Sequence, residues 1–327
     1  MPHLYENGYA LLIGVNESRV PAWALPVVAK DVVALETVLV HPERCAYPVE
    51  NVRKIWGSGA TRAGIFDGLA WLRDCIQKDA SGNATAVIFY SGHGWCPDPP
   101  APPEFLLIPY DIAEDAIQSQ GLRAEDFAAA VEAIKPERML IIIDSCHSAG
   151  MVKAPGTRGA EMHISTPPGF TTGTMPFSLL LGREEILIQK GMRGIGVLSR
   201  GRGRAVLNSC TSEQLSYIRR DGEMSIFTYY LIEGLTGHAQ PQEGASEVLV
   251  SDVMGHVSRR VPESVRNEWG KKQDPEYQIS GSNFSIAMLL GGKGLGRGQT
   301  APSPLEAATH QSARPVYRSA LRGTGSQ

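Results

Sequence analysis

Charge of one sign and long apolar runs are both missing from this sequence. Its 31 lysines and arginines nearly balance its 34 aspartates and glutamates, for a net charge of -3, so no global field favours nucleic acid or a membrane surface. No stretch approaches the ~18 apolar residues of a membrane-spanning helix. The first apolar run, 9–15, follows the acidic Glu6 and precedes no small-residue cleavage site, which predicts a strand and not a signal peptide. We therefore expect neither a nucleic-acid nor a membrane partner.

Cysteine is scarce as well. The chain of 327 residues has five, at positions 45, 75, 96, 146 and 210, and the number is odd. Without an export signal, this speaks against a disulfide framework and favours reduced thiols in the cytoplasm. A chain of this length can bury a core without such crosslinks. We expect Cys45, Cys75 and Cys210 to be small buried hydrophobic residues, which leaves room for one thiol with a chemical role.

Strands and helices alternate through the first half of the chain. The apolar spacing predicts strands at 9–15, 51–56, 84–90 and 139–144, and helices at 27–39, 61–78 and 122–134. Thr61 is the expected N-cap of the second helix. The stretch Trp95–Pro103 has five prolines in nine residues and is predicted to be a loop. Repeated β-then-α alternation predicts an α/β fold, with a mostly parallel sheet covered by helices on both faces.

The second half is less regular. Residues 150–204 are rich in Gly, Pro, Ser and Thr and carry many basic residues, which predicts an exposed connection that proteases can cut. Order resumes with a strand at 205–208, helices at 225–235 and 250–261, and a strand at 284–290. We therefore expect a large catalytic part (1–150), a linker (151–203), a small part of the same domain (204–290) and a disordered tail (291–327).

Two polar motifs follow strands and carry the groups of a cysteine protease, which needs a thiolate, a base and donors for an oxyanion. His93 follows the strand 84–90 between two glycines, and Cys146 follows the strand 139–144. Because ligands of such sheets bind beyond the carboxyl ends of the strands, we expect both side chains at one edge. His93 would be the base and Cys146 the nucleophile, with the backbone N–H groups of Gly94 and Cys146 as oxyanion donors.

The order of these residues leads to a family resemblance. The histidine precedes the cysteine by 53 residues (146 − 93), as in caspases. YSGHG at 90–94 and DSCHS at 144–148 resemble the catalytic motifs of metacaspases and related bacterial caspase-like proteases, in peptidase family C14. The first strand of that family resembles YALLIGVN here, and its small subunit resembles AVLNSCTSEQ and GEMSIFTYYLIEGLTG. The resemblance covers residues 8–150 and 203–290 and implies a caspase-like three-layer α/β/α sandwich with a Cys–His dyad.

The same resemblance implies a substrate pocket. In metacaspases an acidic residue two before the nucleophile, an Asp of the first helix and a Ser two before the histidine line the primary specificity pocket. The matching residues are Asp144, Asp31 and Ser91. Animal caspases bind substrate Asp through an Arg, where this sequence has Ala24. Two buried carboxylates favour a guanidinium, so the expected substrates are proteins or peptides with Arg, then Lys, at the cleavage site.

Basic residues of the linker match this specificity. They are expected sites of self-cleavage, or of cleavage by an upstream activating protease, in a zymogen. The candidate processing sites are Arg158, Arg183, Arg193, Arg200, Arg202 and Arg204. The resemblance implies a role in regulated proteolysis, such as cell death or antiphage (antiviral) defence.

Metal chemistry and an inactive fold stay open as alternatives. Many metacaspases bind calcium through Asp residues, and Asp98, Asp111 and Asp115 are available here, but Lys153 stands where the family has one of these acids. No cofactor is therefore assigned, with calcium as the open exception. The Cys/His types of His93-x-x-Cys96 and Cys146-His147 suit zinc, although the prolines after Cys96 disfavour that site. A catalytically idle scaffold is the other alternative.

Overall fold

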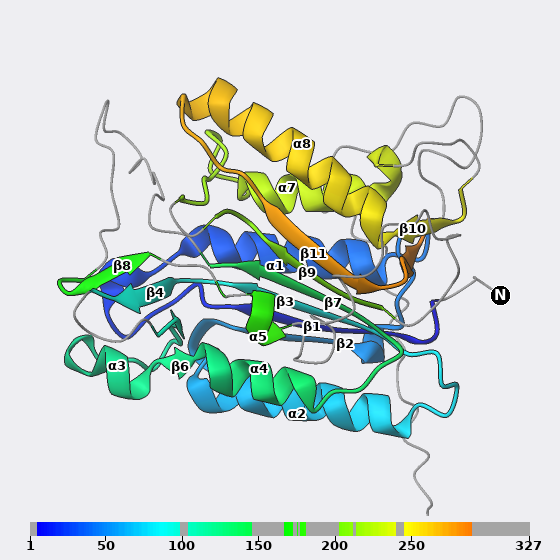
Figure 1. The fold of residues 1–327 in the computed structure, drawn as a ribbon, viewed down its shortest axis with the longest axis horizontal. Coiled ribbons are helices and arrows are strands. Elements are labelled where there is room, and N and C mark those ends of the chain that lie inside the picture. Colours follow the sequence, from blue (N-terminus) through cyan, green and yellow to red (C-terminus); the bar gives the residue numbers. More distant parts are fainter. Residues whose placement is uncertain are drawn as a thin grey trace, which may run out of the picture.

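The computed structural model describes residues 5–98, 104–145, 167–172, 175, 177–180, 203–211, 214–239 and 245–289. Its centre is a six-stranded sheet in the order β11-β9-β7-β3-β1-β2 (Figure 1). The strands are β1 (Gly8–Gly14), β2 (Val52–Trp56), β3 (Thr85–Ser91), β7 (Arg138–Asp144), β9 (Gly203–Asn208) and β11 (Glu276–Gly281). All neighbours pair in parallel except β11, which runs antiparallel to β9.

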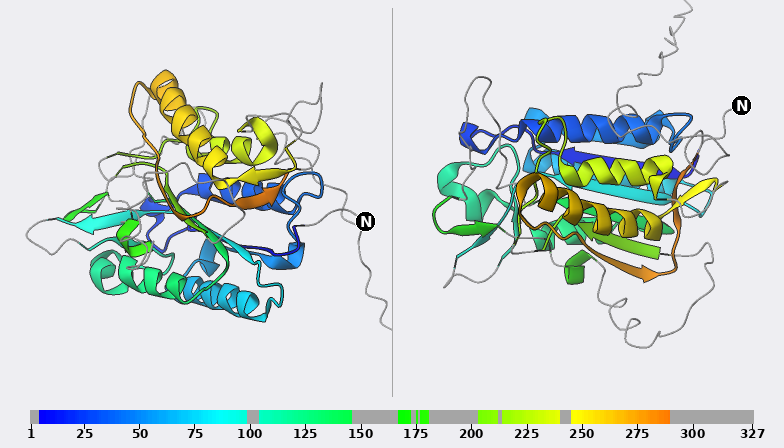
Figure 2. Two further views of the ribbon diagram at one scale, coloured as in Figure 1. Left: turned by 45° about the vertical axis from the view of Figure 1, so that its right-hand side comes forward. Right: turned by 90° about the horizontal axis from the view of Figure 1, so that it is seen from above.

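Helices cover both faces of this sheet. One layer holds α1 (Pro26–Val40), α7 (Ile226–Glu233) and α8 (Val250–Trp269), and the other holds α2 (Arg62–Lys78) and α4 (Ala124–Glu132) (Figures 1 and 2). Successive strand residues project to opposite faces, so Leu12 joins the core beneath α1, α7 and α8, whereas Leu11 joins the core beneath α2 and α4. The expected three-layer α/β/α sandwich with a mostly parallel sheet is thus confirmed.

Local side-chain and backbone chemistry explains where helix α2 begins and where helix α8 ends. Thr61 caps α2 as predicted, because its side-chain oxygen accepts a hydrogen bond from Gly64 N at 2.9 Å. The prediction for α8 stopped too early, since the helix runs through Pro262 to Trp269. Val257, Val261 and Val265 are all buried, so the apolar face continues past the proline and outweighs its local cost. Gly270, at φ 64°, then ends the helix in the left-handed region.

The predicted loop after His93 is partly wrong. Its first residues belong to β4 (Gly94–Pro97), which pairs with β5 (Leu106–Leu107) and β8 (Phe170–Thr172) in a four-stranded sheet completed by β6 (Leu122–Arg123). Trp95 is 1% exposed, and burying this side chain outweighs the low strand propensity of its surroundings. Pro97 stands at the end of β4, where a missing N–H is tolerated. Residues 99–103 lie outside the described residues.

Two further strands form a separate antiparallel pair. The predicted last strand is β12 (Ser285–Met288), and it pairs with β10 (Glu247–Leu249). The remaining helical turns are η1 (Pro21–Trp23), η2 (Val49–Asn51), η3 (Gly57–Gly59), η4 (Glu114–Ala116), α3 (Ile117–Gln120), α5 (Phe177–Leu180) and the π-turn η5 (Gly234–His238). Within the described ranges, no helix has the length and apolar character needed to cross a membrane.

Parts of the expected linker pack onto the domain. β8 pairs with β4, Met175 and Leu180 are buried, and Asn208 Nδ2 donates to Met175 O at 3.1 Å. The processing candidates Arg158, Arg183, Arg193, Arg200 and Arg202, and the expected tail from residue 291, lie outside the described residues. Arg204 lies inside β9, opposite Met139 of β7 and Ser280 of β11. Cleavage after Arg204 would therefore require β9 to leave the sheet.

Candidate active site

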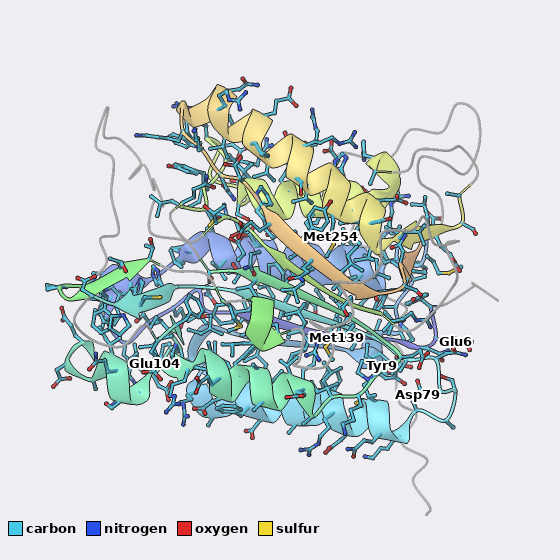
Figure 3. All side chains as sticks on the ribbon, in the orientation of Figure 1. Glu6, Tyr9, Asp79, Glu104, Met139 and Met254 are labelled. Carbon is cyan, nitrogen blue, oxygen red and sulfur yellow. The ribbon has the colours of Figure 1, made fainter. Side chains whose placement is uncertain are left out.

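Strand register brings the two predicted catalytic motifs to one edge of the sheet. β3 and β7 pair with Ser91 opposite Asp144, and Gly92 N donates to Asp144 O at 3.1 Å. His93 is two residues beyond Ser91, and Cys146 is two residues beyond Asp144. Cys146 lies outside the described residues, so its pairing with His93 stays a prediction that the register supports. This edge is the end of the molecule that holds Glu104, opposite the end that holds Tyr9 and Asp79 (Figure 3).

Both glycines beside His93 are required by close contacts. A Cβ added to Gly94 would lie 2.9 Å from Ser145 Cβ and 2.6 Å from the ring of Phe105. A Cβ added to Gly92 would lie 2.9 Å from the hydroxyl of Tyr90. The backbone of the SGHG motif therefore runs directly against the end of β7. Gly94, one of the two predicted oxyanion donors, touches the residue that precedes Cys146.

The imidazole of His93 is held in one tautomer. The side chain is 3% exposed, and Nε2 lies 3.0 Å from the backbone oxygen of Trp23. Because a carbonyl oxygen can only accept a hydrogen bond, Nε2 carries the proton, and Nδ1 is the proton-accepting nitrogen of the neutral ring. The backbone oxygen of His93 accepts from Tyr90 Oη at 3.1 Å and from Ile108 N at 3.1 Å. The geometry is that of an oriented base.

Aromatic side chains fix the plane of this imidazole. The ring of Trp95 lies 5.1 Å from that of His93, and Trp23 meets Trp95 edge-on at 4.9 Å. Phe170 of β8 packs on Trp95 at 6.4 Å. These rings belong to a separate buried cluster under the four-stranded sheet. Trp23 carries no signal in the sequence, because its backbone carbonyl acts and any residue type could supply one.

The predicted pocket acids lie together. Asp31 of α1 and Asp144 at the end of β7 are both 0% exposed, although 113 positions separate them in the chain (144 − 31). Ser225, the N-cap of α7, bonds to both. Its backbone N donates to Asp31 Oδ1 at 2.9 Å, and its hydroxyl donates to Asp144 Oδ2 at 3.4 Å. Asp31 Oδ2 is buried and has no hydrogen-bond partner among the described residues.

Burial changes the ionisation of Asp31. Desolvation raises the pKa of Asp31 from its ordinary value of 3.8 to about 8, against the stabilising N–H of Ser225, and the negative charge of Asp144 raises it further. At neutral pH Asp31 therefore keeps its proton. A cation that binds between the two carboxyl groups would displace that proton, because it stabilises the ionised form.

Ser91 completes the predicted pocket set. Its side chain is 0% exposed, and its position opposite Asp144 in the parallel pair places both side chains on the same face of the sheet. The Ser91 hydroxyl is buried with no hydrogen-bond partner among the described residues. The three residues predicted for substrate binding are thus all buried, with Ser91 opposite Asp144 and Ser225 bonded to both Asp144 and Asp31.

The residues considered for a metal do not gather in the described part of the chain. No group of three or more His, Cys, Asp or Glu side chains that could hold an ion occurs there. Asp111 Oδ1 instead accepts from Arg62 N at 2.9 Å, at the start of α2. Cys96 lies within β4, opposite Thr171 of β8. Calcium and zinc therefore gain no support from the positions of Asp111 and Cys96.

Comparison with known proteins covers the whole of this site. A family model described as a caspase domain, of peptidase family C14, matches residues 7–283. No curated protein matches the chain. A solved crystal structure of a Geobacter sulfurreducens protein is similar, with 18% identity and a TM-score of 0.49, over 86% of this chain and 99% of that one. The range of the family match includes Asp31, His93, Asp144 and Ser225.

Proposed function

This chain belongs to the caspase-domain family of cysteine peptidases, and on that basis we propose that it is an endopeptidase that cleaves after arginine or lysine. One observation carries the specificity. Asp31 and Asp144 are fully buried side by side, and Asp144 ends the strand that pairs with the strand leading to His93. Burying two carboxyl groups is costly unless a cation joins them, so the natural occupant is a basic side chain.

The proposed chemistry uses a Cys–His dyad. Nδ1 of His93 takes the thiol proton of Cys146, and the thiolate attacks the carbonyl carbon of the scissile bond. The amides of Gly94 and Cys146 stabilise the oxyanion. The imidazolium gives its proton to the leaving amine, and the acyl-enzyme is then hydrolysed by a water that His93 deprotonates. The carbonyl of Trp23 accepts from Nε2 and so stabilises the imidazolium while it exists.

Arginine fits the pocket better than lysine for a geometric reason. A guanidinium presents several N–H donors in one plane and can bond to both carboxylates at once, whereas an ammonium is a compact and more strongly hydrated charge. Asp31 Oδ2 has no hydrogen-bond partner among the described residues and is a ready acceptor. A substrate Asp would place a third carboxyl group beside two others, so cleavage after Asp is expected to be negligible.

A fluorogenic peptide panel tests this proposal. Peptides with Arg, Lys and Asp before the cleaved bond are compared with and without calcium, using wild type, Cys146→Ala and His93→Ala. Cys75→Ala is the matched control, because this thiol lies on α2 in the helix layer that covers the face opposite α1. We expect cleavage after Arg, then Lys, in wild type and Cys75→Ala alone. Cleavage after Asp, or undiminished activity of Cys146→Ala, would refute the proposal.

Activation by cleavage is part of the same proposal. The linker sites Arg158, Arg183, Arg193, Arg200 and Arg202 fit the proposed specificity, whereas Arg204 is held in a paired strand. Mapping the cleavage fragments of wild type and Cys146→Ala shows whether the protein cuts itself or another protease cuts it. Bands present only in wild type indicate self-processing, and identical bands in both indicate another protease. A zymogen of this kind would serve regulated proteolysis, such as cell death or antiphage defence.

A further inference from the structure

We propose that Ser225 is the positioning residue that sets the preference for arginine over lysine. This rests on the proposed function. Ser225 is 0% exposed and lies 194 residues from Asp31 and 81 residues from Asp144, yet it bonds to both. Its hydrogen bonds therefore join the two acids of the pocket directly.

The hydrogen bonds of Ser225 have fixed directions. Its hydroxyl oxygen accepts from Thr228 N at 3.1 Å, as the N-cap of α7. The single hydroxyl proton is therefore left to donate to Asp144 Oδ2, at 3.4 Å. The backbone N–H of the same residue donates to Asp31 Oδ1 at 2.9 Å. One oxygen of each carboxyl group is thus anchored, which fixes the rotation of both groups about their side-chain bonds.

Ser225 is itself held rigidly. It ends a tight antiparallel turn in which Arg219 N donates to Met224 O at 3.0 Å and Ile226 N donates to Tyr217 O at 2.9 Å. Lys30, the neighbour of Asp31 on α1, donates to Gly222 O at 3.1 Å in the same turn. Helix α1 therefore bonds to this turn through two successive side chains, Lys30 at Gly222 and Asp31 at Ser225 itself.

Carboxyl groups held in fixed orientations affect the binding of an arginine substrate more than that of a lysine substrate. Two coplanar hydrogen bonds to a guanidinium need both acids at set angles, whereas an ammonium accepts a wider range of directions. Removing the hydroxyl of Ser225 takes away the hydrogen bond that orients Asp144 Oδ2 from this side. It should therefore weaken the binding of arginine far more than that of lysine.

The test is the ratio of kcat/KM for matched Arg and Lys peptides, measured in wild type, Ser225→Ala, Ser225→Cys and Thr61→Ala. Both substrates are assayed on one preparation, so the ratio does not depend on the folded fraction. Ser225→Cys keeps the size of the side chain and covers the case in which the Ala variant does not fold. Thr61→Ala removes an equivalent N-cap hydroxyl from α2, outside the pocket.

We expect the Arg to Lys ratio to fall about tenfold in both Ser225 variants, mainly through KM for Arg, since the lost bond is to a charged group. Thr61→Ala should keep the wild-type ratio. Equal losses on both peptides in the Ser225 variants would show a capping role only and overturn the inference. A wild type that cleaves neither peptide would instead overturn the proposed function, and this inference with it.

Discussion

Replacing Asp31 by Asn should change how the stability of the protein depends on pH. Desolvation, opposed by the Ser225 N–H and increased by the charge of Asp144, raises the pKa of Asp31 from 3.8 to about 8. The folded protein therefore holds a proton that the unfolded chain releases between these two values. Stability must fall as pH rises from about 4 to about 8, because the unfolded state binds fewer protons there. An asparagine side chain does not titrate, so the Asp31→Asn variant lacks this slope.

The size of the effect follows from the two pKa values. At about 1.36 kcal/mol per pH unit, holding the proton costs about 2 kcal/mol of folding free energy at pH 5 and about 4 kcal/mol at pH 7. The wild type should therefore lose about 2–3 kcal/mol more than Asp31→Asn between pH 5 and pH 7. Below about pH 4 the contribution of this proton vanishes, since Asp31 is protonated in both states.

Urea unfolding at pH 5, 6 and 7, followed by tryptophan fluorescence, measures this difference. A Cys146→Ala background prevents self-cleavage during the experiment. Asp67→Asn is the matched control, because Asp67 is an exposed carboxyl group on α2, and its curve should run parallel to wild type. If Asp31→Asn also runs parallel to wild type, the carboxyl group is solvated and the buried acidic pocket does not exist as described.

Further predictions concern substrate binding and two glycines, one beside His93 and one in α8. KM for an arginine peptide should fall by up to about tenfold per unit between pH 6 and pH 8, because Asp31 must lose its proton to bind the guanidinium; a flat KM would contradict this. Gly94→Ala should lower kcat/KM by at least about a hundredfold in the same peptide assay, since the new methyl group displaces Ser145. Gly255→Ala, in α8 with nothing within 4 Å of its added methyl group, should instead stabilise the protein by about 0.5–1 kcal/mol in urea unfolding. A destabilised Gly255→Ala, or a fully active Gly94→Ala, would refute these packing arguments.

The fold was predictable where burial alone decides the structure. The central strands β1, β3 and β7 are continuous apolar runs, buried on both faces, and no other pattern competes with them. β11 was missed because it is a polar edge strand, with its first two residues exposed, and it pairs on one side only. β4 was missed because prolines surround it, while the burial of Trp95 that favours it depends on distant residues such as Trp23.

The candidate site likewise contains residues that the sequence predicts and residues that it does not. His93 is recognisable from its residue type and its place after a strand, whereas Asp31 and Asp144 are assigned through the resemblance to metacaspases. The parallel register then places His93 and Asp144 at one edge. The residues that hold these side chains in place by hydrogen bonds leave no such signal in the sequence. Trp23 acts through its backbone oxygen, and Ser225 is one serine among many until the turn from Tyr217 to Ile226 places it between two acids. Contacts of this kind depend on tertiary structure that no local pattern encodes.

The contacts between the large and small parts limit what cleavage of the linker can do. β9, which follows the cut segment, lies between β7 and β11, and it pairs with β7 from Gly203 to Asn208. Ser225 also bonds to acids of the large part. A cut between residues 181 and 202 breaks none of these contacts, so we expect Asp31, Asp144 and Ser225 to stay together before and after it. We expect the two fragments of the cleaved protein to elute together in size-exclusion chromatography and to separate only in denaturant. Separate elution under native conditions would mean that the sheet is not continuous across the cut, and that activation assembles the pocket instead of opening it.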